Sequence, residues 1–194
     1  MKRIALYGGT FDPIHHGHLI LARETVEVFT LDQLFFIPAA VSPHKLDLAT
    51  APAELRLAML VAAIQGEPRF SIDELEQQRP PPSYAIDTVE AFRGRYPDAE
   101  LFYLIGEDQL ARLSTWHRFL ELEQMVKFIV LNRGGAAAHH PYLSVDRQVE
   151  ISATDIRNRV ATRRSIRYLV TKAAEAIIRE RRLYQELDKS LKKI

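Results

Sequence analysis

The chain has 194 residues, of which 47% are apolar, and it contains no cysteine. This length and composition predict one compact domain with a sizeable core, and they exclude a Cys nucleophile, a Cys-ligated zinc site and a disulfide framework. No apolar run approaches the roughly 18–20 residues of a membrane span, and the apolar stretch near Met1 is too short for a signal-peptide core. A cytoplasmic protein is therefore expected.

The net charge of +1 conceals an uneven distribution of charge. Residues 1–155 carry 14 basic and 21 acidic side chains, a net of −7, whereas residues 156–194 carry 12 basic and 4 acidic side chains, a net of +8. A basic segment of this kind suits a phosphate site, a nucleic-acid surface or solvated helix faces. Its apolar stripe and its lack of interleaved aromatic residues favour packed helices over a nucleic-acid platform.

Predicted strands and helices alternate along the chain. The expected elements are, in order, strand 3–7, helix 17–29, strand 34–37, helix 52–64, strand 70–72, helix 83–92, strand 101–105, helices 108–113 and 119–125, strands 127–131 and 148–151, and helices 152–160 and 166–187. Ser83 is the expected N-cap of its helix, and Leu55 and Met59 are expected on the buried face of helix 52–64. The last helix is expected to bury Leu169, Ala173 and Ile177.

This alternation is typical of βαβ units. The expected fold is therefore an α/β domain with a Rossmann-like parallel sheet and helices on both faces, because right-handed crossovers place helices on the two sides. We expect residues 1–150 to form the nucleotide-binding α/β domain, and residues 151–194 to form a small C-terminal helical subdomain packed on it. Ligands bind beyond the carboxyl ends of strands in such sheets, which makes the loops after Tyr7, Ile37 and Ile105 candidate binding loops.

The stretch after the first strand reads Gly-Gly-Thr-Phe-Asp-Pro-Ile-His-His-Gly-His, from Gly8 to His18. Two glycines let a ligand approach the backbone closely, and the free N–H groups at the start of the next helix favour an anion. His15 and His18 are three residues apart, so on a helix both imidazoles face one ligand group. Taken alone, such a pair is more often made of ordinary helix-start residues, and a zinc site lacks an evident third ligand. The chain contains neither a Walker loop nor a G-x-G-x-x-G fingerprint.

Other side chains at the predicted binding edge have two interpretations each. Lys45 follows the second strand, where a cation can hold a phosphate, although an isolated loop lysine is usually only solvated. Trp116 is the only tryptophan, and its ring suits either the core or stacking on an aromatic ligand. Ser152, Thr154 and Arg157 open a predicted helix with two hydroxyls and a guanidinium, which suits a phosphate cradle or an ordinary cap with an exposed arginine.

The run from Gly8 to His18 resembles the signature of the HxGH nucleotidylyltransferases, with His15-His16-Gly17-His18 as the H-x-G-H. Four further segments, at 36–45, 82–88, 105–116 and 151–157, resemble the bacterial nicotinate mononucleotide adenylyltransferases and occur in that family's order over nearly the whole chain. The resemblance implies that the adenylyl group of ATP is transferred to nicotinate mononucleotide, giving nicotinate adenine dinucleotide and pyrophosphate in NAD biosynthesis.

The resemblance also implies roles for individual residues. It makes His15 and His18 the catalytic residues. It implies that ATP contacts Gly8, Gly9, Thr10, Phe11, His15, His18, Gly106, Asp108, Ser152, Thr154 and Arg157. It implies that nicotinate mononucleotide contacts Lys45, Ser83, Tyr84, Ala85, Trp116 and Arg133. Mg²⁺ is expected as a cofactor carried mainly by the ATP phosphates, with no metal site on the protein. Nucleic acid and membrane are not expected partners, and a homo-oligomer is left open.

Two departures from the family leave the acceptor open. Ala85 stands where the family often has Thr near the nicotinate carboxylate, and Ala40 stands where Asn is common. The main alternative is therefore an adenylyltransferase that prefers nicotinamide mononucleotide. A pantetheine-phosphate adenylyltransferase is less favoured, because that shorter family lacks the segments around Trp116 and Ser83. A non-catalytic nucleotide sensor is also less favoured, because it would not need both histidines.

Overall fold

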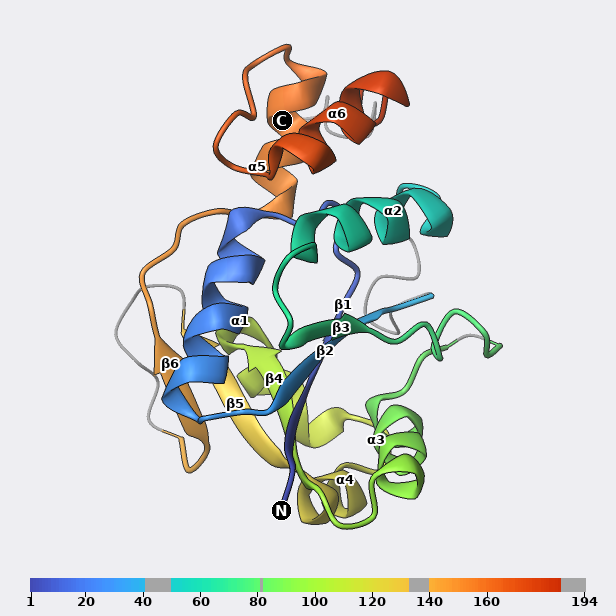
Figure 1. The fold of residues 1–194 in the computed structure, drawn as a ribbon, viewed down its shortest axis with the longest axis vertical. Coiled ribbons are helices and arrows are strands. Elements are labelled where there is room, and N and C mark those ends of the chain that lie inside the picture. The colour runs from blue at the N-terminus through green and yellow to red at the C-terminus, as the bar shows by residue number, and fades with distance from the viewer. Residues whose placement is uncertain (41–49, 81, 133–139, 186–194) are drawn as a thin grey trace.

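The computed structural model describes residues 1–40, 50–80, 82–132 and 140–185. Its centre is a six-stranded parallel sheet in the order β3-β2-β1-β4-β5-β6 (Figure 1). The strands are β1 (Arg3–Gly9), β2 (Gln33–Pro38), β3 (Phe70–Ile72), β4 (Glu100–Gly106), β5 (Lys127–Asn132) and β6 (Leu143–Asp146). The helices are α1 (His16–Val28), α2 (Ala53–Ile64), α3 (Ala85–Arg95), the 3₁₀ helix η1 (Glu107–Thr115), α4 (Phe119–Met125), α5 (Ala153–Ala161) and α6 (Lys172–Glu180).

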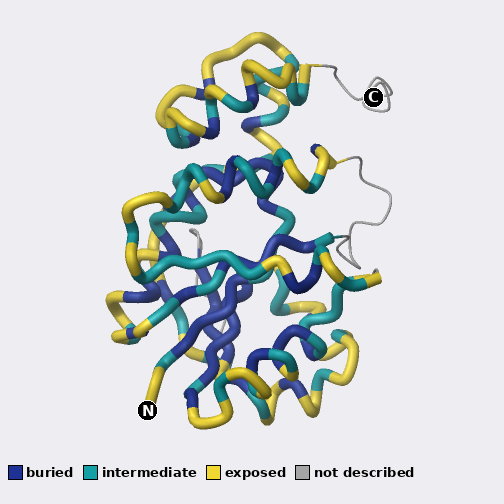
Figure 2. Tube along the Cα trace, turned by 45° about the vertical axis from the view of Figure 1, so that its right-hand side comes forward, coloured by how far each residue is buried: buried dark blue, intermediate teal, exposed yellow. Residues whose placement is uncertain are grey.

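Successive residues of each central strand enter two different cores, because side chains alternate between the faces of a sheet. In β1, Ala5 and Tyr7 pack with α1, α2, α5 and α6, whereas Ile4 and Leu6 pack with α3, η1 and α4. Figure 2 shows the central strands as the most continuously buried part of the molecule. The expected Rossmann-like sheet with helices on both faces is confirmed.

The strand order reverses at β1, which has β2 on one side and β4 on the other. After β2 and β3 on one side of β1, the chain crosses over and adds β4 on the other side. The loops that follow β1 and β4 therefore run in opposite directions at the carboxyl ends of these strands. This position is the crevice in which open α/β sheets bind their ligands. In Figure 1, α1 runs back along the sheet from this end, and α5 and α6 lie beyond α2 at the same end.

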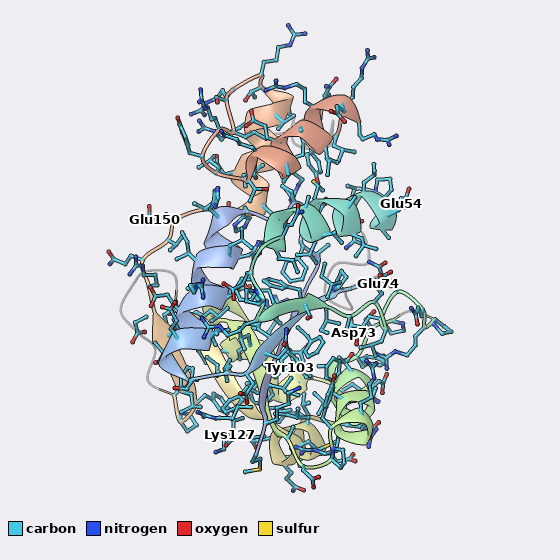
Figure 3. All side chains as sticks on the ribbon, in the orientation of Figure 1. Glu54, Asp73, Glu74, Tyr103, Lys127 and Glu150 are labelled. Carbon is cyan, nitrogen blue, oxygen red and sulfur yellow. The ribbon has the colours of Figure 1, made fainter. Side chains whose placement is uncertain are left out.

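The C-terminal helices share a core with the sheet. Ile156 of α5 and Ala174 and Ile178 of α6 belong to the apolar cluster that contains Ala5 and Met59. The yellow outer turns of α5 and α6 in Figure 2 show that their opposite faces are exposed. The basic residues of this segment include Arg159, Arg163, Arg164 and Arg179, and Figure 3 shows nitrogen-tipped side chains projecting outward from these helices. Among the described helices, none has both the length and the apolar character needed to cross a bilayer.

Two predicted elements differ from the structure. The last strand is β6 at Leu143–Asp146, paired in parallel with β5, and not residues 148–151. The expected helix 166–187 is also wrong: α6 covers only Lys172–Glu180. Residues before and after α6 adopt the left-handed region without being glycine, with φ of 69° at Tyr168 and 53° at Arg182, and this conformation does not continue a helix.

Two helix faces and one cap also differ from expectation. The buried residues of α2 are Arg56, Met59 and Leu60, while Leu55 is half-buried. In α6 the buried face is one residue further along, at Ala174 and Ile178, and Ala173 is exposed. The N-cap of α3 is Tyr84, which makes no side-chain capping bond, so the prediction of Ser83 as the cap is wrong. The helix expected at 108–113 is the longer 3₁₀ helix η1.

Candidate functional site

The loop after β1 ends in a cap made by the two histidines themselves. His15 is the N-cap of α1, and the backbone N–H of His18 donates to its Nδ1 at 3.4 Å. In return the backbone N–H of His15 donates to Nδ1 of His18 at 3.3 Å. This is a capping box in which imidazoles replace the usual hydroxyl and carboxylate. The two rings stack with centroids 3.7 Å apart and planes 22° apart.

The capping box determines which ring nitrogen carries the proton. Because Nδ1 of each ring accepts a backbone N–H, a neutral imidazole at either position must hold its proton on Nε2. His15 is 1% exposed and His18 is half-buried. The cap therefore fixes two parallel imidazoles as Nε2–H donors at the N-terminus of a helix, where the helix dipole already favours an anion.

The absence of a side chain at Gly17 allows the start of α5 to approach the start of α1. A Cβ on Gly17 would lie 3.0 Å from the His15 ring and 3.3 Å from the carbonyl oxygen of Ile151, so a side chain there would crowd both. Ile151 immediately precedes Ser152, the N-cap of α5, whose hydroxyl oxygen accepts the backbone N–H of Asp155 at 3.1 Å. The N-termini of α1 and α5 therefore meet next to the stacked histidines.

Arg157 and Thr154 extend this surface. One guanidinium nitrogen of Arg157 donates to the backbone carbonyl of Asp12 at 2.7 Å, and the other donates to Thr154 Oγ1 at 3.2 Å. A guanidinium has five N–H donors, so Arg157 keeps donors for a ligand after both contacts. Ser152 and Thr154 are exposed, and the Ser152 hydroxyl can still donate its proton after accepting the capping bond.

Aromatic rings surround the histidine pair. The Phe11 ring lies edge-on to His18 with centroids 5.2 Å apart, and Tyr7 lies 5.5 Å from Phe11. Phe11 has a φ of 47°, a conformation that is rare for a bulky residue and that often marks a functional site. A Cβ on Gly9 would lie 2.9 Å from the Phe11 ring, so glycine at that position allows the loop to fold back. Thr10 is half-buried within the same loop.

The loop after β4 carries the predicted nucleotide contacts Gly106 and Asp108. Gly106 is the N-cap of η1, and the exposed Asp108 follows in its first turn. A Cβ on Gly106 would collide with Asp108 Oδ1, which shows that the carboxylate folds back over the end of β4. Gln109 Nε2 donates to the other carboxylate oxygen at 2.6 Å. Asp108 is therefore not the helix cap, and it presents an acceptor at the sheet edge.

A second group of predicted residues lies on the other face of the sheet. Trp116 ends η1 and packs edge-on against Tyr103, with centroids 5.9 Å apart. Tyr103 lies in the interior (Figure 3), and its hydroxyl would be 2.5 Å from a Cβ on Gly8. The Tyr103 side chain therefore connects Trp116 to the end of β1. Burial raises the pKa of the Tyr103 hydroxyl well above its usual value, so this hydroxyl is neutral.

The start of α3 adjoins Trp116. The Tyr84 ring packs against that of His117 at 4.4 Å, and Ser83, Tyr84 and Ala85 are each half-buried. Beneath them, the Thr88 hydroxyl donates to Glu76 Oε1 at 2.7 Å and accepts from Arg79 at 2.8 Å. Burial raises the pKa of Glu76, partly opposed by the hydrogen bond from Thr88.

The structure thus brings most of the sequence-predicted residues to the end of β1, in two groups on opposite faces of the sheet. His15, His18, Phe11 and the start of α5 lie on the face of α1. Trp116 and Tyr84–Ala85 lie on the face of α3. Lys45 and Arg133 lie outside the described residues. The described part of the chain holds no group of three His, Cys, Asp or Glu side chains that could bind one metal ion.

Three polar residues at this edge were missed from the sequence: the buried Asp12 and Arg56 and the half-buried Tyr184. Arg56 is 2% exposed, and burial lowers its pKa, although the nearby Asp12 charge opposes this effect. Its spacing to Met59 and Leu60, at i+3 and i+4, is the signal that could have placed it on the buried face. Asp12 lies within the signature, but no periodicity indicates its burial. Nothing in the sequence links Tyr184 to it.

The chain is similar to known proteins over most of its length. The chain matches the Cytidylyltransferase-like family over residues 6–159. A probable nicotinate-nucleotide adenylyltransferase of Bacillus pumilus (strain SAFR-032) is 40% identical over 188 residues, covering 95% of this chain and all of that protein. Another, of Shouchella clausii (strain KSM-K16), is 42% identical over 191 residues, covering 95% of this chain and 97% of that protein.

Solved structures confirm the fold. The Plasmodium falciparum nicotinic acid mononucleotide adenylyltransferase complexed with NaAD superposes with a TM-score of 0.82, covering 96% of this chain and 99% of that one, at 16% identity. At this identity the likeness concerns the fold alone, whereas the full-length sequence relatives show the family. The chain belongs to the cytidylyltransferase-like nucleotidyltransferases and, among them, to the nicotinate-nucleotide adenylyltransferase family.

Proposed function

We propose that this protein transfers the adenylyl group of ATP to nicotinate mononucleotide, forming nicotinate adenine dinucleotide and pyrophosphate in NAD biosynthesis. The observation that carries the proposal is the convergence of two helix N-termini, those of α1 and α5, on the stacked imidazoles of His15 and His18. The full-length relatives named as nicotinate-nucleotide adenylyltransferases support the identity of the acceptor.

The chemistry needs little from protein acids and bases. The phosphate of nicotinate mononucleotide is already an anion at neutral pH, so one of its oxygens can attack the α-phosphorus of ATP without losing a proton first. A new bond forms between that oxygen and the α-phosphorus, the bond to the bridging oxygen of the β-phosphate breaks, and pyrophosphate leaves with the electron pair. The protein must hold two polyanions in line and stabilise the charge that develops on the phosphates.

The side chains on the α1 face supply donors for that charge. We assign His18 Nε2–H to the α-phosphoryl oxygens and His15 to the phosphate chain. Thr154 and the spare donors of Arg157 hold the departing phosphates, beside the free N–H groups at the start of α5. Gly8, Gly9, Thr10 and Phe11 bring the backbone of the loop up to the nucleotide. Gly106 and Asp108 face its ribose or base.

The residues on the α3 face bind the acceptor. Trp116 stacks on the pyridine ring, and the backbone N–H groups at the start of α3, near Tyr84 and Ala85, receive the carboxylate. Lys45 and Arg133 complete the contacts to the mononucleotide phosphate. Because the two groups of residues lie on opposite faces and meet at β1, a dinucleotide product would span the end of the sheet.

Mg²⁺ enters this scheme as part of the substrate. The ion is expected to be carried by the ATP phosphates and water. There it lowers the repulsion between the two polyanions. The residues that this chain contributes bind and orient the phosphates themselves.

Pyrophosphate release tests the proposal. The purified protein is incubated with ATP and Mg²⁺ and with either nicotinate or nicotinamide mononucleotide, and kcat/KM is measured for each acceptor. We expect turnover with both substrates present and a higher kcat/KM for nicotinate mononucleotide. A preference for the amide would overturn the acceptor assignment, and no release with either mononucleotide would overturn the reaction.

A further inference from the structure

A buried polar cluster lies directly behind the stacked histidines, and it joins four segments of the chain. Its centre is the carboxylate of Asp12, which is 6% exposed. Oδ1 of Asp12 accepts the hydroxyl proton of Tyr184 at 2.6 Å. The same carboxylate accepts the backbone N–H of Ala51, with oxygen distances of 3.3 and 3.4 Å. The backbone carbonyl of Asp12 receives the guanidinium of Arg157 at 2.7 Å.

Arg56 continues the cluster on the other side of Ala51. Its guanidinium donates to three backbone carbonyls, those of Ala51 at 3.1 Å, Thr10 at 2.7 Å and Ala39 at 3.0 Å. Asp12 accepts the backbone N–H of Ala51 and Arg56 donates to the backbone C=O of the same residue, so Ala51 links the two buried side chains. These bonds hold the loop after β1 against the end of β2 and the start of α2.

Among the described residues beyond α6, Tyr184 is the only one whose side chain makes a hydrogen bond to this loop. Its backbone lies in the left-handed region, with φ of 60°, an unfavourable conformation for a tyrosine that persists only when its surroundings hold it. Burial and the adjacent Asp12 charge raise the pKa of the Tyr184 hydroxyl, so it stays protonated and donates. The C-terminal segment therefore reaches back to Asp12, which lies three residues before His15.

We propose that Asp12 and Tyr184 are positioning residues for adenylyl transfer: their hydrogen bond locks the C-terminal helices onto the loop after β1 and so sets Arg157 and Thr154 against His15 and His18. This inference rests on the proposed function. Neither residue contacts the phosphates in this scheme. Their effect comes through the segment 10–15, which Asp12 anchors, and through α5, whose Arg157 is bound to the same residue.

The most specific variant is Tyr184→Phe, because it removes one hydroxyl and keeps the ring. Tyr168→Phe is the matched control, since Tyr168 belongs to the same subdomain and is 76% exposed. We expect Tyr184→Phe to lower kcat/KM for ATP about 10-fold, the size of effect typical of losing one hydrogen bond to a charged group. KM for nicotinate mononucleotide should change less than about two-fold, and Tyr168→Phe should match the wild type in every measurement.

A purely structural role would lower Tm without changing the kinetics of the folded fraction. Assays are therefore run well below the Tm of each variant, and kcat and both KM values are compared there. Asp12→Asn supplies a rescue arm, because an amide oxygen can still accept from Tyr184 and Ala51. We expect Asp12→Asn to keep most of the activity that Asp12→Ala loses. Wild-type kinetics in a folded Tyr184→Phe protein would overturn the proposal.

Binding of a non-hydrolysable ATP analogue, measured by calorimetry, separates this proposal from the proposed reaction. If the wild-type protein makes no dinucleotide, the reaction is wrong, but the analogue still reports on the nucleotide site. The positioning role predicts a Kd about 10-fold weaker in Tyr184→Phe and unchanged in Tyr168→Phe. Equal Kd values in Tyr184→Phe and the wild type would overturn it.

Discussion

The contact between Gly8 and Tyr103 gives a quantitative test of packing at the point where the strand order reverses. A Cβ on Gly8 would lie 2.5 Å from the Tyr103 hydroxyl oxygen but 3.4 Å from its Cζ, which is an ordinary contact. Tyr103 is 5% exposed and packs edge-on against Trp116 and Phe128, so the ring has little room to withdraw. Gly8→Ala should therefore disturb the core mainly through one oxygen atom.

The expected cost of this overpacking is about 1–3 kcal/mol of unfolding free energy. Tyr103→Phe removes the oxygen, and Gly8→Ala should then cost less than about 0.5 kcal/mol, since the remaining contact is unstrained. The double-mutant cycle of Gly8→Ala and Tyr103→Phe should accordingly give a coupling of about 1–3 kcal/mol.

Urea unfolding of the wild type, the two single variants and the double variant measures this coupling, provided that the m-values agree. Equal destabilisation by Gly8→Ala with and without the Tyr103 hydroxyl would refute the reasoning. It would mean that backbone movement, and not the hydroxyl, limits the space beside Gly8.

Three further predictions concern the chemistry, the acceptor and the pH dependence of stability. His18→Ala should lower kcat by about 10²–10³-fold, because it removes a donor to the charge that develops on the phosphates. It should also lower the free energy of unfolding by roughly 1 kcal/mol, because it removes part of the helix cap. Circular dichroism checks that the variant is folded. Trp116→Ala should raise KM for nicotinate mononucleotide about 10-fold and leave KM for ATP unchanged. Steady-state kinetics with each substrate varied in turn measures both values, and an unchanged KM for the mononucleotide would contradict the stacking role. Glu100 accepts hydrogen bonds from Lys127 at 2.6 Å and Arg3 at 2.9 Å, which hold its pKa below the ordinary 4.5. Because its folded pKa is lowered, Glu100 stabilises the protein above pH 4.5 and this contribution is lost as the pH falls through the folded value. Glu100→Gln should therefore cost less than about 1 kcal/mol at pH 7, and urea unfolding should show the difference from the wild type shrinking below pH 4.5.

The central fold could be predicted from sequence because its signals are local. The apolar runs at 101–105 and 128–131 are buried on both faces, as parallel strands are, and they correspond to β4 and β5. By contrast, β6 is a short strand at the sheet edge, where only Val145 is fully buried, so its pattern is weak. The expected helix 166–187 is reduced to α6, because Tyr168 and Arg182 on either side of it have positive φ. Neither residue is a glycine, so the sequence does not indicate this conformation.

The site could be located from the sequence, but its supporting contacts could not. The glycines and the histidine spacing between Gly8 and His18 are compatible with a phosphate-binding loop, and the resemblance of the whole run to the HxGH signature favours that interpretation. The capping box formed by His15 and His18 follows from coordinates, since sequence spacing alone does not show which ring nitrogen accepts a backbone N–H. The Asp12–Tyr184 bond joins residues 172 positions apart, a separation that no local pattern encodes.

The central claim is that the α-phosphorus of ATP is transferred to the phosphate of nicotinate mononucleotide. Incubation with ATP labelled at the α-phosphate, followed by chromatography of the products, tests it most directly. We expect the label in nicotinate adenine dinucleotide in a one-to-one ratio with the pyrophosphate released, and we expect His18→Ala to lower the rates of both signals by the same factor. Label recovered in AMP, with no labelled dinucleotide formed, would contradict it.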